Sequence, residues 1–250
     1  MRVLLAVFSL LFLVHETATK SIYQAYVINL PKRPERLVSI AGQLDKEGIP
    51  YVVQNAISPE DIEAEVLARR NNEPSPGAFV PETKLNFTTG IFPKIRQTEL
   101  GCFQSHVQAL IKISKSKTND PVLILEDDAN LETDFYVRST KFLSNLPENW
   151  DVFQVGYCGT ARCSLVRPQK AGLCKIKISM LPCTHGYFVN GSKAAKILLS
   201  TLNTPAPAGI LDFVLFKTTP NYYASVPKLA TQIFEFGSDN GNGKSAWRSK

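Results

Sequence analysis

The chain has 250 residues, of which 44% are hydrophobic and 20% are charged. This composition is typical of a folded globular protein of one domain, or at most two small ones, and it excludes a disordered chain, a collagen and a membrane protein with several spans. The 28 basic and 22 acidic residues give a formal net charge of +6. Because the basic residues are scattered, we expect anionic small ligands and no nucleic acid.

The chain begins with a basic residue and an apolar run, Arg2 followed by residues 3–14. A run of this length is too short for a comfortable transmembrane helix, and its layout is that of a secretory signal. We therefore expect residues 1–19 to be a signal peptide, with no stable membrane span, and the protein to lie in the endoplasmic reticulum lumen or to be secreted. The alternative is a retained anchor or an apolar first helix.

The first part of the chain alternates between strand and helix patterns. Residues 24–30 are mainly apolar and are followed by Pro31, which predicts a buried strand. Apolar side chains at helical spacing follow in residues 34–48, then a short strand at 51–53 and a second helix at 59–70. Residues 71–97 are rich in proline and show no periodicity, which is typical of a functional or mobile loop.

The same alternation continues to about residue 200. The predicted elements are a helix at 98–113, a strand at 122–125, a helix at 133–144, strands at 150–155 and 184–189, and a helix at 192–200. This order predicts an α/β fold, a mostly parallel sheet flanked by helices, with ligands at the carboxyl ends of the strands. We expect a single domain at 23–236 and a flexible tail at 237–250.

Five cysteines are present, and four of them lie between residues 158 and 183. In a chain that enters the secretory pathway they allow two disulfides and one remaining thiol, and this clustering favours local bridges. None of the spacings is that of a zinc knuckle, which disfavours a zinc site. Cys102 lies within a helical pattern and is interpreted as a small buried hydrophobic residue.

Three acids, Glu126, Asp127 and Asp128, follow the predicted strand at 122–125 directly. Acids in this position lie where sheets of this class bind ligands. Strand alternation places Glu126 and Asp128 on the same side, where their oxygens can share Mg²⁺ or Mn²⁺. The alternative is a polar loop that caps the next turn, with solvated side chains.

Four separated blocks of residues carry a more specific signal. They are Val27–Leu30 with Arg33 and Arg36, Glu99–Cys102 with Ser105 and His106, Ile124–Ala129 with Phe135, and Thr184–Tyr187 followed by Asp212. Together they resemble glycosyltransferase family 25, which includes bacterial lipooligosaccharide galactosyltransferases and animal procollagen galactosyltransferases. The resemblance extends over residues 24–235.

This resemblance implies a GT-A fold and a metal-dependent, inverting transfer of galactose or glucose from a UDP-sugar donor to a hydroxyl of a protein or glycan acceptor. It implies Mn²⁺ or Mg²⁺ as cofactor, with Glu126 and Asp128 as metal ligands. A collagen-like acceptor is one candidate, although the chain is shorter than the animal enzymes and ends without their retention signal.

Five further residues are candidates for binding the donor: Asn29, Arg33, Arg36, His106 and Asp127. The two arginines follow the first strand and suit charge-assisted hydrogen bonds to phosphate. Alternatively, they solvate the first turn of a helix. His106 is either part of the active-site wall or a hydrogen-bonded core histidine, and Asn29 is either a donor ligand or a polar residue that satisfies the end of a strand.

An inverting transfer needs one general base to accept the proton of the acceptor hydroxyl. Asp212 is the first candidate and His185 the second. Asp212 can also be explained as an ordinary acid near a helix N-terminus, which the helix dipole favours. The competing function is a catalytically inactive family member that acts as a secreted binding or adhesion protein; the presence of all the site acids favours the enzyme.

Overall fold

The computed structural model describes residues 22–71, 97–159, 164–165, 172–176, 181–201, 219 and 221–237. The predicted signal peptide at 1–19, nearly all of the predicted loop at 71–97, and the predicted tail beyond residue 237 lie outside the described residues. The candidate base Asp212 lies outside them as well.

One sheet of ten strands organises the described part of the chain, and most of its strands follow the order β2-β1-β3-β8-β5-β9-β7-β6. The strands are β1 (Gln24–Asn29), β2 (Tyr51–Asn55), β3 (Val122–Glu126), β4 (Ala129–Leu131), β5 (Val152–Gly156), β6 (Ser164–Leu165), β7 (Leu173–Lys175), β8 (Gly186–Val189), β9 (Tyr222–Ser225) and β10 (Ala230–Gln232). β1 pairs in parallel with β2 and β3, and β5 with β9 and β10. Only β4, β7 and β8 run against the others, so the predicted mostly parallel sheet is confirmed.

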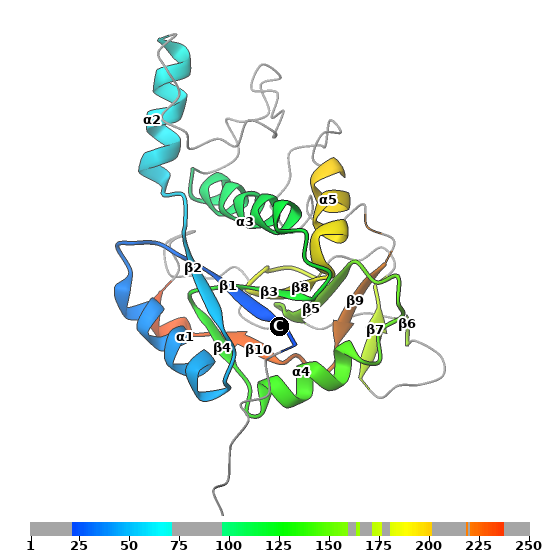
Figure 1. Cartoon of the computed structure of the whole chain (residues 1–250). Helices are drawn as coiled ribbons and strands as arrows, with labels where there is room; N and C mark the ends of the chain where they lie inside the picture. The colour runs from blue at the N-terminus through cyan, green and yellow to red at the C-terminus, as the bar shows by residue number, and fades with distance from the viewer. Residues whose placement is uncertain are drawn as a thin grey trace, which may run out of the picture.

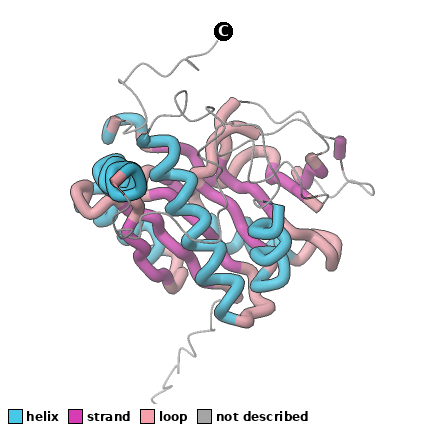
Figure 2. The backbone as a smooth tube through the Cα atoms, turned by 90° about the horizontal axis from the view of Figure 1, so that it is seen from above, coloured by secondary structure: helices cyan, strands magenta, loops and turns pink. Residues whose placement is uncertain are grey.

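Helices cover both faces of this sheet. α3 (Gln97–Ser116) and α5 (Gly191–Thr201) lie over one face, and α1 (Pro34–Lys46) and α4 (Phe135–Leu143) lie over the other (Figure 1). Seen from above, the strands run beneath the helices of the upper face (Figure 2). The remaining helix, α2 (Pro59–Arg70), packs against α3. Each face has its own apolar core, which fits a sheet buried on both sides.

β3 shows why the centre of the fold was predictable. It lies between β1 and β8, and its four aliphatic residues, 122–125, are 0–1% exposed. Ile124 packs into the core under α3, whereas Leu123 and Leu125 pack into the core under α1 and α4. By the same alternation, Glu126 continues on the α3 face and Asp127 on the α1 face.

Gly101 and Ser105 of α3 pack this helix against the chain segment that follows β2. A Cβ on Gly101 would lie 2.5 Å from the carbonyl oxygen of Ile57, so only glycine permits this approach. The hydroxyl of Ser105 donates to the carbonyl oxygen of Gly101 (2.7 Å) and accepts from the backbone N–H of Ile57 (2.8 Å). These contacts fix the position of the next residue, His106.

Several local expectations need refinement. The second helix is present, but Leu67 of α2, one of its apolar residues, is 56% exposed. The strand predicted at 184–189 is β8, and it runs antiparallel to both neighbours. The shorter strands β4, β6, β7, β9 and β10 were not predicted, because two to four residues carry too little periodicity.

A disulfide between Cys158 and Cys183 joins the loop after β5 to the segment before β8, which confirms the predicted local bridge. Cys174 is also disulfide-bonded. Cys102 is outside any disulfide and packs, partly buried, against the core under α3. Among the described helices, none is long and apolar enough to cross a membrane.

Candidate functional site

The three acids after β3 enter three different environments. Glu126 is the last residue of β3, and Asp127 and Asp128 form the turn into β4. β4 pairs with β10, which brings the C-terminal strand of the described chain next to this turn. The acids therefore lie between α3, α1 and β10, at the carboxyl end of a central strand.

Two side chains donate hydrogen bonds to Glu126, whose side chain is 21% exposed. The hydroxyl of Thr184 donates to Oε1 at 2.7 Å, and Nε2 of His106 lies 3.2 Å from the same oxygen. Burial favours the neutral acid, but the contacts with His106 and Thr184 outweigh it and lower the pKa of Glu126. Glu126 is therefore an ionised carboxylate held in a fixed orientation.

His106 connects Glu126 to a buried tyrosine. The imidazole is fully buried, and its Nδ1 lies 2.9 Å from the hydroxyl of Tyr187. Because the Glu126 carboxylate only accepts, Nε2 carries the proton, and in the neutral ring Nδ1 accepts from the tyrosine O–H. Burial raises the pKa of Tyr187, so its hydroxyl keeps the proton that it donates. Tyr187, His106 and Thr184 thus hold the Glu126 carboxylate.

Asp127 lies on the α1 side, where three groups bind its carboxylate. Oδ2 accepts from the side-chain amide of Asn29 (2.8 Å) and from the backbone N–H of Leu30 (3.2 Å), and Oδ1 lies 3.2 Å from Nη1 of Arg36. Burial raises the pKa of Asp127, and the contacts with Asn29 and Arg36 oppose that rise. These bonds tie the turn after β3 to the end of β1 and to α1.

Arg33 and Arg36 both reach the C-terminal end of the described chain. Arg33 donates to the carbonyl oxygen of Phe236 and pairs with Glu35 through Nε at 2.7 Å. Arg36 is buried and donates to the carbonyl oxygen of Gly237 at 2.8 Å. The structure thus gathers Asn29, Arg36 and Asp127 in one network and leaves Arg33, with a side chain 21% exposed, at its edge.

One carboxylate oxygen of Asp128 has no hydrogen-bond partner among the described residues. Its Oδ2 accepts from the side-chain amide of Gln232 (3.3 Å), whereas Oδ1 is buried and accepts from none of them. Burial and the nearby charges of Glu126 and Asp127 raise the pKa of Asp128 to about 7. A buried carboxylate oxygen beside other carboxylates fits a divalent cation, because the cation supplies the missing partner and removes the repulsion.

His185, the second candidate base, is 1% exposed. Its Nε2 lies 3.4 Å from the carbonyl oxygen of Ala230, and burial lowers the pKa of the imidazole. The ring packs so closely on Gly156 that a Cβ there would overlap it. Sequence reasoning assigned no role to Thr184, Tyr187 or Gln232. Thr184 and Tyr187 belong to the block at 184–187, and that block is the feature of the sequence that could have indicated them.

Comparisons with known proteins place this chain in a family. The model of "Glycosyltransferase family 25 (LPS biosynthesis protein)" matches residues 22–211. The chain belongs to glycosyltransferase family 25. A "Glycosyltransferase 25 family member" of Drosophila melanogaster is 28% identical over 147 residues, 59% of this chain and 22% of that protein. Its counterpart in Aedes aegypti is 29% identical over 133 residues, 52% of this chain and 20% of that protein. The chain therefore spans about a fifth of the length of these relatives.

Two solved structures are similar at low sequence identity. A glycosyltransferase involved in the glycosylation of the major capsid of PBCV-1 has a TM-score of 0.43 and 11% identity, covering 87% of this chain and 94% of that chain. A197 from STIV has a TM-score of 0.40 and 15% identity, covering 83% and 82%.

Proposed function

We propose that this family 25 protein is a metal-dependent, inverting glycosyltransferase that moves galactose or glucose from a UDP-sugar to a hydroxyl of a protein or glycan in the secretory pathway. The observation that carries the proposal is the buried Oδ1 of Asp128, which has no hydrogen-bond partner in the described part of the chain and feels the charge of the oriented Glu126 carboxylate. The Cys158–Cys183 bridge supports the secretory location, because disulfides persist in oxidising compartments.

Glu126 and Asp128 would hold Mn²⁺ or Mg²⁺ with their oxygens, in a GT-A-like arrangement. When bound, such an ion supplies positive charge that stabilises the UDP leaving group. The protein contributes orientation: Thr184 and His106 fix Glu126 from the α3 side, and Gln232 fixes Asp128 from β10. Second-sphere hydrogen bonds of this kind commonly set metal affinity.

The remaining roles divide between the donor and the acceptor. Arg33, with a partly exposed guanidinium beside the turn, is the better placed of the two arginines to meet a donor phosphate. Arg36 and Asp127 already bind each other and hold the turn in place. Asp212 remains the first candidate for the base, because the imidazole of His185 is almost fully buried and an acceptor hydroxyl needs direct access to its base.

The test is UDP release from UDP-galactose and UDP-glucose with Mn²⁺, with collagen-like peptides, with glycans and without acceptor. Asp128→Asn should lower turnover at least about a hundredfold, the scale of one strong electrostatic contact to a transition state. Asp120→Asn is the matched control, because Asp120 is an exposed acid just before the other end of β3. Full turnover in EDTA would refute the metal role. Binding of Mn²⁺ and UDP without turnover on any donor would instead support the binding protein.

A further inference from the structure

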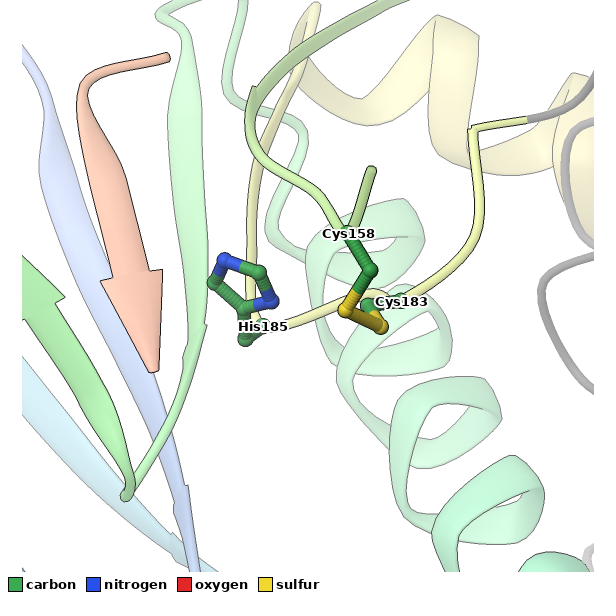
Figure 3. A group of neighbouring side chains, drawn as sticks. All are labelled: Cys158, Cys183 and His185. Atoms are coloured by element: carbon green, nitrogen blue, oxygen red, sulfur yellow. A yellow bond between two sulfur atoms is a disulfide. The ribbon is translucent and has the colours of Figure 1, made fainter. Parts of the chain in front are cut away.

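One ring nitrogen of His185 lacks a hydrogen-bond partner in the described part of the chain. The side chain is 1% exposed, and Nδ1 makes no hydrogen bond to any described residue. The Cδ2–Nε2 edge packs on Gly156, which leaves Nδ1 on the other side of the ring. Figure 3 shows one ring nitrogen facing the bridge between Cys158 and Cys183. A buried polar atom without a partner is costly, so its position calls for an explanation.

The two sulfur atoms and an imidazole nitrogen of His185 form a compact set of metal ligands, all within 4.8 Å of one another. Two thiolates and one imidazole are the ligands that Zn²⁺ prefers. Zn–S bonds of about 2.3 Å and Zn–N bonds of about 2.0 Å separate tetrahedral ligand atoms by roughly 3.5 Å. Small side-chain rotations therefore suffice to bind the ion once the S–S bond is open.

The backbone keeps the two cysteines together without the covalent bond. Their Cα atoms are 5.5 Å apart, and the N–H of Cys158 donates to the carbonyl oxygen of Pro182 at 2.8 Å. The neighbouring pair Gly156 and Gly186 belongs to the β5–β8 ladder. The two cysteines are partly exposed, so a reductant and an ion can reach them.

A lysine side chain also lies beside the backbone of Cys158. Nζ of Lys228 donates to the carbonyl oxygens of Tyr157 (2.8 Å) and Gly159 (3.5 Å), the two residues that flank Cys158. A positive charge beside a cysteine stabilises its thiolate, which is the form that binds metal. The ammonium group therefore lies beside the backbone on both sides of Cys158.

We propose that Cys158, Cys183 and His185 form a redox-controlled zinc site. While the disulfide is closed, neither sulfur is a thiolate and the site is unavailable. A dithiol reduces the bridge to two thiols and is itself oxidised to a disulfide; Zn²⁺ then binds both sulfurs and the imidazole, two thiol protons pass to solvent, and water takes the fourth position. Sequence spacing gave no hint of this site, because its ligands come from two segments 25 residues apart.

Cobalt titration tests the proposal, because Co²⁺ bound to thiolate has a near-ultraviolet charge-transfer band that carboxylate-bound Co²⁺ lacks. Reduced, folded wild-type protein should develop this band at one Co²⁺ per chain, and Zn²⁺ should abolish it. The oxidised protein should show no band. The site does not depend on the proposed transferase activity, so the assay is independent of turnover.

Substitution of each proposed ligand tests whether that residue binds the metal ion. Cys158→Ser and Cys183→Ser should each weaken or eliminate the band, and His185→Gln should weaken Co²⁺ binding at least about tenfold, a loss that even outer-sphere partners of a metal cause. Cys102→Ser is the control, because Cys102 belongs to a second cluster of ligand atoms, with His106 and Glu126; it should leave the band intact. A band that persists in the Cys158→Ser, Cys183→Ser double variant would overturn the proposal, and so would loss of far-ultraviolet ellipticity on reduction.

Discussion

Asp127→Asn separates a structural role from a role in donor binding. The carboxylate accepts from Asn29 and Leu30 at one oxygen and pairs with Arg36 at the other. An asparagine keeps only one acceptor oxygen, so its amide N–H₂ group would face a donor. Leaving a buried polar group unpaired costs about 1–3 kcal/mol, and breaking a buried ion pair costs about 3–5 kcal/mol.

Burial raises the pKa of Asp127, so the ionised carboxylate already carries a desolvation cost in the folded protein. The variant removes that cost. We therefore expect the free energy of unfolding to fall by an amount within the lower of the two ranges, about 2 kcal/mol. For a chain of this size, that loss corresponds to a decrease in Tm of about 4–8 °C.

Thermal and urea unfolding would measure this loss, with Asp120→Asn as the control expected to stay within about 0.5 kcal/mol. Below its unfolding transition, Asp127→Asn should bind Mn²⁺ and UDP as the wild type does. An unchanged Tm together with a loss of UDP binding would refute the reasoning and would support a direct contact between Asp127 and the donor.

Three further substitutions or conditions test the site and the docking of α3. Thr184→Val removes one donor to Glu126 and should weaken Mn²⁺ affinity about tenfold in a calorimetric titration; unchanged affinity would exclude a role in orienting that carboxylate. Gly101→Ala should lower the free energy of unfolding in urea by about 1–3 kcal/mol, because its Cβ meets a backbone carbonyl oxygen, whereas Gly42→Ala, with open space around it, should be neutral or stabilising; equal effects would contradict the contact. In EDTA, Tm should fall as the pH rises from about 5 to about 8: the raised pKa of Asp128, about 7, means that the folded state binds a proton that the unfolded state has lost, and Asp128→Asn should flatten this dependence.

The sequence by itself determined the main α/β framework. β3 is a continuous aliphatic run and α3 repeats its apolar residues every three or four positions, so each carries enough periodicity to be recognised alone. The block of acids after β3 and its resemblance to family 25 indicated the candidate site. Predictions for Asp212 and for the signal peptide remain to be tested, because both concern residues outside those described.

The hydrogen-bond partners of each of the three acids could be established only from the tertiary structure. Alternation predicts that Asp127 lies opposite Glu126, but not that Arg36 and Asn29 bind it or that no described residue donates to Oδ1 of Asp128. β4 and β10 are three residues each, too short to be recognised, and their pairing brings Gln232 to Asp128 from a position 104 residues away. Local sequence encodes periodicity, whereas the partners of a buried charge are set by contacts between distant segments, which no local pattern records.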